Sequence, residues 1–285
     1  MSTPTTIDPI KPEAGAVHIS DVLAESWSLR ESALMSLGMA VNAAARTTGF
    51  VQLRSISGQS AAAGDGTGKD ALWSNDNGIA MIPIWGVLRR SDSQVQDEWG
   101  RYGTSHEMIR RAMAQADADP SVFAKVFVID SPGGVSSGMD GLATQVRESN
   151  ARKPIVAYVD GGAYSAAYWI AASASKIVAE RDRGVGSIGT YMVAYDYQKY
   201  LADAGITAHL ISSGGIKGQG AFGTPITDEL KANLKRSVDS LQGLFSEAVA
   251  KGRNIAPERV AAMATGEEWI GEAAKAAGLI DSVSG

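Results

Sequence analysis

Short apolar runs alternate with helical stripes along the chain after residue 78. Predominantly apolar runs occur at 79–88, 126–129, 155–159 and 177–179, and turn or polar residues bound them, which is typical of buried strands. Helical spacing connects Met108, Ile109, Ala112 and Ala116, and later Leu142 and Val146. Buried strands separated by helices predict an α/β fold with a mostly parallel sheet.

The last third of the chain is predicted to be mainly helical. Thr227 is suited to cap a long helix, because threonine oxygens accept hydrogen bonds from helix N-terminal N–H groups. The apolar stripe of this helix consists of Leu230, Leu234, Val238, Leu241 and Phe245. Pro257 favours the first position of another helix. Residues 267–283 then predict a strand, a helix with a glycine C-cap, and a final strand.

Two glycine-rich segments, 184–190 and 212–225, interrupt this pattern. We expect both to be loops outside the core, because glycine has no side chain to pack there. A short helix near 195–204 and a strand at 208–211 are expected between them.

The first 75 residues have a different character. Residues 1–17 show no periodicity and predict a flexible arm, whereas apolar residues at near-helical spacing over 19–45 predict one or two amphipathic helices. Residues 56–70 have the Gly/Ser/Ala-rich composition of a linker. The chain therefore divides into a helical extension, 1–75, and an α/β domain, 76–285.

Composition excludes several functions. A net charge of -5 gives no basic surface for nucleic acid, which we exclude as a partner. The absence of cysteine rules out a disulfide framework, a thiolate metal site and a cysteine nucleophile. No secretory signal and no run of about 18 apolar residues is found, so we expect a cytoplasmic protein without a membrane span. No motif indicates a metal or an organic cofactor.

Ser165 is the candidate nucleophile. In the sequence DGGAYSAAYW, residues 160–169, it follows a strand and a glycine turn and begins a helix-forming run. A helix N-terminus offers unpaired N–H groups and a positive potential that suit an oxyanion. The alternative is that Ser165 only caps the helix, because serine is a preferred N-cap residue.

A serine nucleophile requires a base, and the three histidines are poorly suited to that role. His18 lies in the arm, His106 lies inside a predicted capping box that starts at Thr104, and His209 lies in the predicted strand. Each is therefore interpreted as structural. A lysine replaces histidine where burial lowers the lysine pKa from about 10.4 to about 7 or 8.

Lys217 is the candidate base. It is flanked by glycine and isoleucine, and no acidic residue lies closer to it in the sequence than Asp228, so no near neighbour holds it charged. Lys153, Lys176 and Lys199 lie at element edges or among acidic residues, as solvated lysines do. The alternative is an ordinary exposed loop lysine.

Two glycine turns complete the candidate site. A backbone N–H from the turn Gly133-Gly134 is suited to join the N–H of Ala166 as an oxyanion donor, although a tight strand-to-helix turn explains the same residues. The hydroxyl of Ser187 is suited to orient a lysine amine. We expect Gly133, Val135, Ile188 and Gly189, beside these turns, to bind an extended peptide by strand addition.

Four motifs together resemble the signal peptide peptidase A family, including its phage protein C branch. They are DSPGG at 130–134, GGAYSAAYWIA at 161–171, VGSIGT at 185–190 and SGGIKG at 213–218. The resemblance implies that Ser165 is the nucleophile and Lys217 the base, that Ser187 helps to hold the lysine, and that Gly134 and Ala166 form the oxyanion hole.

The same resemblance implies a fold and a biological role. The fold is that of the Clp protease/crotonase superfamily, with stacked ββα units, and its members commonly form rings or domes of identical subunits. The phage branch processes scaffold or capsid proteins during head maturation. We therefore expect a homo-oligomeric serine endopeptidase with a Ser-Lys dyad, active on protein substrates in the host cytoplasm or procapsid.

Three alternatives remain open. A cellular peptidase of the same family would clear signal-peptide remnants. A crotonase-type acyl-CoA enzyme would share the fold and a pair of oxyanion N–H groups, but would not use Ser165 and Lys217. A non-catalytic assembly protein would keep the fold and dock through its N-terminal extension.

Overall fold

The structure, a computed structural model, describes residues 72–76, 78–91 and 103–284. Short strands are also present at 16–18, 27–29, 50–52, 54–55 and 93–94, whose backbone alone is described. Most of the expected arm, helices and linker of 1–75 lies outside the described residues. Within the expected helical stretch 19–45, Trp27–Leu29 forms strand β2.

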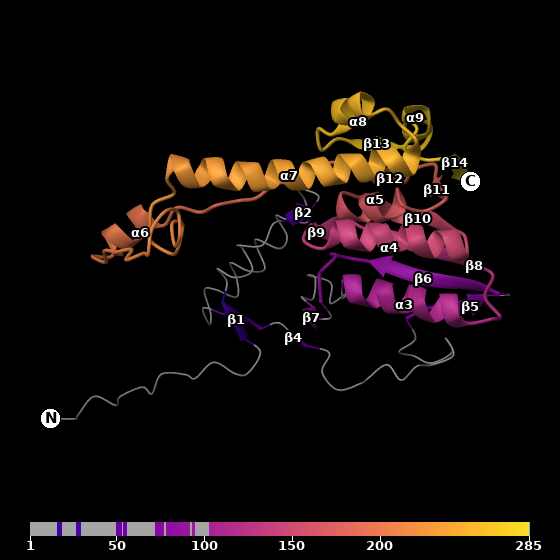
Figure 1. Cartoon of the computed structure of the whole chain (residues 1–285), viewed down its shortest axis with the longest axis horizontal. Coiled ribbons are helices and arrows are strands. Elements are labelled where there is room, and N and C mark those ends of the chain that lie inside the picture. Colours follow the sequence, from indigo (N-terminus) through magenta and orange to yellow (C-terminus); the bar gives the residue numbers. More distant parts are fainter. Residues whose placement is uncertain are drawn as a thin grey trace.

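An eight-stranded sheet forms the centre of the molecule (Figure 1). Its main path runs β13-β12-β10-β8-β6-β5, and β11 and β14 extend it beside β10. Its strands are β5 (Ser74–Asp76), β6 (Ile79–Trp85), β8 (Ala124–Ser131), β10 (Ile155–Tyr164), β11 (Lys176–Glu180), β12 (Gly184–Gly186), β13 (Glu268–Ile270) and β14 (Ser282–Ser284). Only the pairings of β5 with β6 and of β13 with β12 are antiparallel in this sheet. The predicted α/β fold with a mostly parallel sheet is confirmed.

Seven helices lie in the described part of the chain, in the order that the apolar spacing predicted. They are α3 (His106–Ala118), α4 (Met139–Arg152), α5 (Ala166–Ala171), α6 (Gln198–Asp203), α7 (Asp228–Arg253), α8 (Pro257–Met263) and α9 (Gly271–Ala277). Thr227 caps α7 by accepting a hydrogen bond from the Leu230 N–H, and Pro257 begins α8, as predicted. Ser105, not Thr104, caps α3, because the Thr104 hydroxyl bonds the backbone of Trp85 instead.

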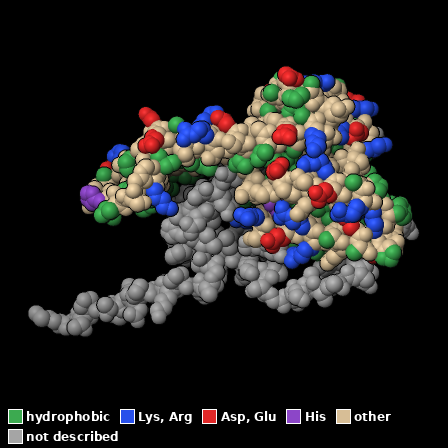
Figure 2. All heavy atoms as spheres, in the orientation of Figure 1, with side chains coloured by type: hydrophobic (Ala, Val, Ile, Leu, Met, Phe, Trp, Pro, Cys, Tyr) green, Lys and Arg blue, Asp and Glu red, His purple; other side chains and the backbone are tan. Residues whose placement is uncertain are grey.

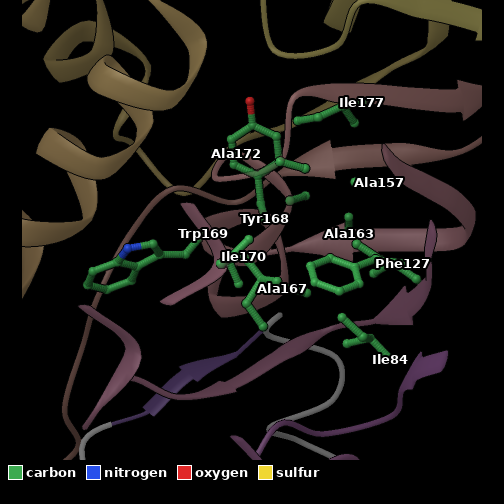
Figure 3. Close-up of a cluster of buried hydrophobic side chains, with 14 of the residues drawn as sticks. Ile84, Phe127, Ala157, Ala163, Ala167, Tyr168, Trp169, Ile170, Ala172 and Ile177 are labelled. Carbon is green, nitrogen blue, oxygen red and sulfur yellow. The ribbon is translucent and has the colours of Figure 1, made fainter. Parts of the chain in front are cut away.

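Helix α5 lies at the centre of the core. All six of its residues are fully buried, as expected for a helix that is apolar all round. Figure 3 shows Phe127 of the sheet on one side of this helix and Trp169 directed to the other. The Trp169 ring stacks on Phe245 of α7 at a centroid distance of 4.6 Å, and the Tyr168 hydroxyl donates to the Leu279 carbonyl at 2.8 Å. These contacts fix α5 to the C-terminal third of the chain.

Residues 191–227 and the N-terminal half of α7 project from this body as an arm (Figure 1). The arm carries α6 and many exposed hydrophobic side chains, visible in green among charged ones in Figure 2. They include Tyr195, Tyr200, Ile206, Ile211 and Phe222, and Ile211 is 95% exposed. In the apolar stripe of α7, Leu230 and Phe245 at its two ends are buried, whereas Leu234, Val238 and Leu241 between them stay half-exposed.

Two predictions for the glycine-rich regions were wrong. Residues 208–211 form no strand; they lie exposed on the arm, where no neighbouring strand pairs with them. The first glycine-rich segment is not outside the core, because Gly184–Gly186 forms the buried strand β12 between β10 and β13.

His106 at the start of α3 provides a pH-dependent contribution to stability. Its side chain is fully buried, and neither ring nitrogen has a hydrogen-bond partner among the described residues. Burial, with the nearby charges of Arg110 and Arg90, lowers the pKa of His106 from 6.5 to about 4. The folded protein therefore disfavours the imidazolium form.

We predict that stability falls between about pH 6.5 and about pH 4. In this window the unfolded chain binds a proton at His106 that the folded chain does not, so the stabilisation present above pH 6.5 is lost on acidification, by roughly 3 kcal/mol. Urea unfolding at about pH 7 and about pH 4.5 measures the difference. His106→Leu should remove most of this decline; an equal decline in both proteins would contradict the assignment.

Candidate active site

Ser165 occupies a strained junction between a strand and a helix. Strand β10 ends at Tyr164 and α5 begins at Ala166, so Ser165 alone makes the turn, with φ 53° and ψ −122°. Its N–H donates to the Gly186 carbonyl at 2.7 Å and its carbonyl accepts from the Trp169 N–H at 3.0 Å. Positive φ at a non-glycine residue costs of order 1–3 kcal/mol and occurs preferentially at functional sites.

The hydroxyl of Ser165 does not cap the helix that it precedes. The side chain makes no capping hydrogen bond, and its Oγ lies 3.5 Å from the Gly189 carbonyl oxygen. The capping alternative therefore does not explain this serine. The first N–H groups of α5, including that of Ala166, have no partner within the helix and lie next to Oγ in the chain.

The carboxyl ends of three parallel strands bring the other candidate residues to the same edge of the sheet. Ser131 of β8 pairs with Ala163 of β10, and Tyr164 pairs with Gly186 of β12. The segment 133–135, Ser165 and Ser187 directly follow these strand ends, and α5 packs against the segment 133–135. Ligand sites of open parallel sheets lie at this edge.

The predicted oxyanion turn forms a short strand, β9 (Gly133–Val135). On one side it bonds Leu88, which donates to the Gly133 carbonyl at 2.8 Å and accepts from the Val135 N–H at 2.9 Å. Because backbone groups alternate along a strand, the N–H and carbonyl of Gly134 face the opposite side. A Cβ at Gly134 would lie 2.0 Å from the Leu88 carbonyl oxygen, so only glycine fits at this position.

A tyrosine ring covers two glycines beside Ser165. Atoms of the Tyr164 ring lie 2.3 Å from the position that a Cβ would take at Gly162, and its hydroxyl lies 2.4 Å from that position at Gly184. Tyr164 therefore fills the volume that two side chains would otherwise take on β10 and β12. This packing explains how the glycine-rich segment forms a core strand, and it fixes the residue before Ser165.

Ser187 and its neighbours form the other wall of the site. Ser187 is nearly buried, has φ 49°, and its N–H donates to the Glu267 carbonyl at 2.7 Å. Ile188 points into the core and is fully buried, so only its backbone faces the neighbouring segment, where its carbonyl accepts from Gly266. Gly189 is half-buried and lies nearest to the Ser165 hydroxyl.

The structure does not bring Lys217 to Ser165 within one chain. Lys217 is exposed in the segment between α6 and α7. This segment lies in the projecting arm, away from the body that contains α5 (Figure 1). The loop that carries Lys217 contacts the start of α7 near Leu230, whereas the site's wall contacts α7 at Val238, which accepts a hydrogen bond from Thr190. Leu230 and Val238 are eight residues, or about 12 Å, apart along the helix.

A different serine and lysine do meet in the chain. The fully buried Lys125 Nζ donates to Ser149 Oγ at 2.5 Å, and it forms an ion pair with Asp117. Burial lowers the pKa of Lys125, and the hydrogen bond to Asp117 opposes this shift. Burial would raise the pKa of Asp117, but hydrogen bonds from Lys125, Arg152 and Ser149 outweigh it, so that pKa is lowered. This cluster ties α3, β8 and α4 together. Its buried, ion-paired lysine has no access to a substrate, so the cluster is structural, and sequence spacing gave no signal for it.

Comparison with known proteins shows a family match for the part of the chain that contains Ser165 and Lys217. Residues 147–285 match the model of peptidase family S49. This match covers 139 of the 285 residues, and it confirms the resemblance to the signal peptide peptidase A and phage protein C family.

Individual relatives show the same resemblance over a larger part of the chain. The head-tail preconnector protein GP5 of Enterobacteria phage P21 is 30% identical over 73% of this chain and 41% of its own length. Capsid assembly protease C of Escherichia phage lambda is 28% identical over 73% of this chain and 46% of its own. Protease 4 of Haemophilus influenzae is 26% identical over 73% of this chain and 33% of its own. The chain thus spans about a third to a half of these relatives.

One solved structure with a similar chain course is an enoyl-CoA hydratase/isomerase family member. It is 16% identical, with a TM-score of 0.44, and the match covers 74% of this chain and 69% of that chain.

Among the described residues, none of the helices combines the length and the apolar character needed to cross a membrane. The described part of the chain also has no group of three or more acidic or histidine side chains arranged to hold a metal ion.

We predict that Ser165→Gly is more stable than Ser165→Ala. Both variants lack the hydroxyl, but glycine adopts a positive φ without steric cost, so it should gain about 1 kcal/mol over alanine, or about 2 °C in melting temperature. Thermal unfolding of the two variants side by side measures this. Equal melting temperatures, or a more stable alanine variant, would show that the turn is unstrained.

Proposed function

We propose that this protein is a serine endopeptidase in which Ser165 is the nucleophile and Lys217 the general base. The observation that carries the proposal is the Ser165 turn, whose positive φ holds a non-capping hydroxyl beside the first N–H groups of a buried helix. The match of residues 147–285, which include both side chains, to peptidase family S49 supports the same chemistry. The Gly134 N–H is the second proposed oxyanion donor, because it faces away from Leu88.

The proposed reaction proceeds through an acyl-enzyme. Ser165 Oγ attacks the peptide carbonyl and its proton passes to the neutral amine of Lys217. The N–H groups of Ala166 and Gly134 stabilise the oxyanion that forms. The C–N bond then breaks as Lys217 returns the proton to the leaving amine. Water, deprotonated by the same lysine, releases the acyl group and regenerates the serine. Ser187, beside Gly186, is the proposed hydrogen-bond partner of the lysine amine.

We further propose that Lys217 serves Ser165 of a neighbouring copy of the chain. Within one chain the lysine lies on a projecting arm, exposed and far from the nucleophile. The same arm exposes hydrophobic side chains, including Tyr200 and Ile211, and leaves part of the α7 stripe uncovered. Contiguous exposed hydrophobic surface favours docking to another protein surface. A docked arm would bury both the apolar residues and the lysine, which favours the neutral amine.

The proposed biological role is the processing of scaffold or capsid proteins of a phage or prophage, in the host cytoplasm or the procapsid. Two relatives, each matched over 73% of this chain, are named as a head-tail preconnector protein and a capsid assembly protease. A cellular peptidase of the same family is the second candidate, since Protease 4 matches the same share of the chain. Cleavage of co-expressed scaffold protein from the same genome, absent in Ser165→Ala, would favour the first.

We predict that Ser165→Ala and Lys217→Ala are each inactive alone but complement each other when mixed. If sites form between copies, random exchange of subunits pairs an intact serine with an intact lysine at about one site in four. Hydrolysis of denatured casein or a fluorogenic peptide, measured before and after subunit exchange, gives the result. A mixture that stays inactive after verified exchange would contradict the shared site.

A second variant tests the base itself. Lys217→Arg should lose activity as completely as Lys217→Ala, because guanidinium stays charged and accepts no proton. In a fluorophosphonate reaction, Ser165 of the parent protein should be labelled and Ser165→Ala should not, by intact mass. Retained activity in Lys217→Arg would remove Lys217 from the role of base, while an unlabelled parent would remove Ser165 from that of nucleophile.

A further inference from the structure

Strand β9 has one edge that is open to a partner strand. Leu88 takes the Gly133 carbonyl and the Val135 N–H on one side, which leaves the N–H and carbonyl of Gly134 for the other. Such an edge accepts an extended peptide through main-chain hydrogen bonds. If the proposed function holds, this is the edge where substrate binds.

The backbone of the protein itself supplies a strand at this edge. Strand β2, Trp27–Leu29, pairs antiparallel with β9, so that Ser28 lies opposite Gly134. The Gly133 carbonyl and the Val135 N–H are bonded to Leu88 and therefore do not face β2. Residues 28 and 134 are thus the pair that exchanges hydrogen bonds between the two strands. The Ser28 carbonyl then accepts from the same Gly134 N–H that is proposed to bind the oxyanion.

We propose that residues 27–29 occupy the peptide-binding edge of β9 as a built-in competitor of substrate. The competition with substrate rests on the proposed function, whereas the pairing of β2 with β9 does not. Residues 27–29 belong to the same chain as Ser165, so their binding to β9 is intramolecular and does not weaken when the protein is diluted. A segment that binds weakly as a free peptide is therefore sufficient to reduce access to Ser165.

The test is Ser28→Pro in the full-length protein. Proline has no N–H and cannot donate to the Gly134 carbonyl, so the pairing should weaken by one backbone hydrogen bond, or about five-fold. The rate of fluorophosphonate labelling at Ser165 should rise by about that factor. Ser60→Pro, in the expected linker 56–70, is the matched control, since it leaves every backbone N–H of β2 in place and should leave the parent rate unchanged. Equal rates in all three proteins would overturn the inference.

A second measurement separates this inference from the proposed function. In the Ser165→Ala background, hydrogen exchange at the Gly134 amide should be about five-fold faster with Ser28→Pro than with Ser60→Pro, whether or not the protein is a peptidase. Unchanged exchange at Gly134 would show that β2 does not hold this edge. If exchange at Gly134 is faster with Ser28→Pro but Ser165 of the parent protein is never labelled, the pairing stands and the peptidase proposal is contradicted.

Discussion

The buried helix α5 is the constraint on which the rest of the structure depends. Six residues with no exposed surface must be covered on every side, and the sheet, α4, α7 and the C-terminal segment all contribute to that cover. Stacking of Trp169 on Phe245 fixes one side and the bond of Tyr168 to Leu279 fixes another. The N-terminal end of this helix cannot shift, so the turn at Ser165 keeps a conformation that would otherwise relax.

Local patterns were sufficient for most of the fold and for the strand-to-helix turn at Ser165. The short buried strands, the cap at Thr227 and the start of α8 at Pro257 depend on neighbouring residues in the sequence, and all three predictions are confirmed. Strand β12 could not be predicted in this way, because the side chain that fills its surface belongs to Tyr164, twenty residues before Gly184. Glycine content alone therefore indicated a loop where the structure has a core strand.

The position of Lys217 shows a second limit of sequence reasoning. Glycine neighbours and the absence of nearby acids favoured a lysine free to act as a base, but spacing along a chain does not say how far apart the fold places two residues. The fold separates Lys217 from Ser165, and it buries a different lysine, Lys125, against an aspartate. Burial and partners, which distinguish these two lysines, arise only from tertiary packing.

The tyrosine ring over two glycines also limits how this sequence can change over time. With Tyr164 in place, a side chain at Gly162 or Gly184 meets the ring at less than 3 Å, so substitutions there are blocked one at a time. A smaller residue at 164 would open space on both strands at once. Positions 162, 164 and 184 should therefore vary together among related chains, and such joint changes would show how the packing beneath Ser165 has changed in evolution.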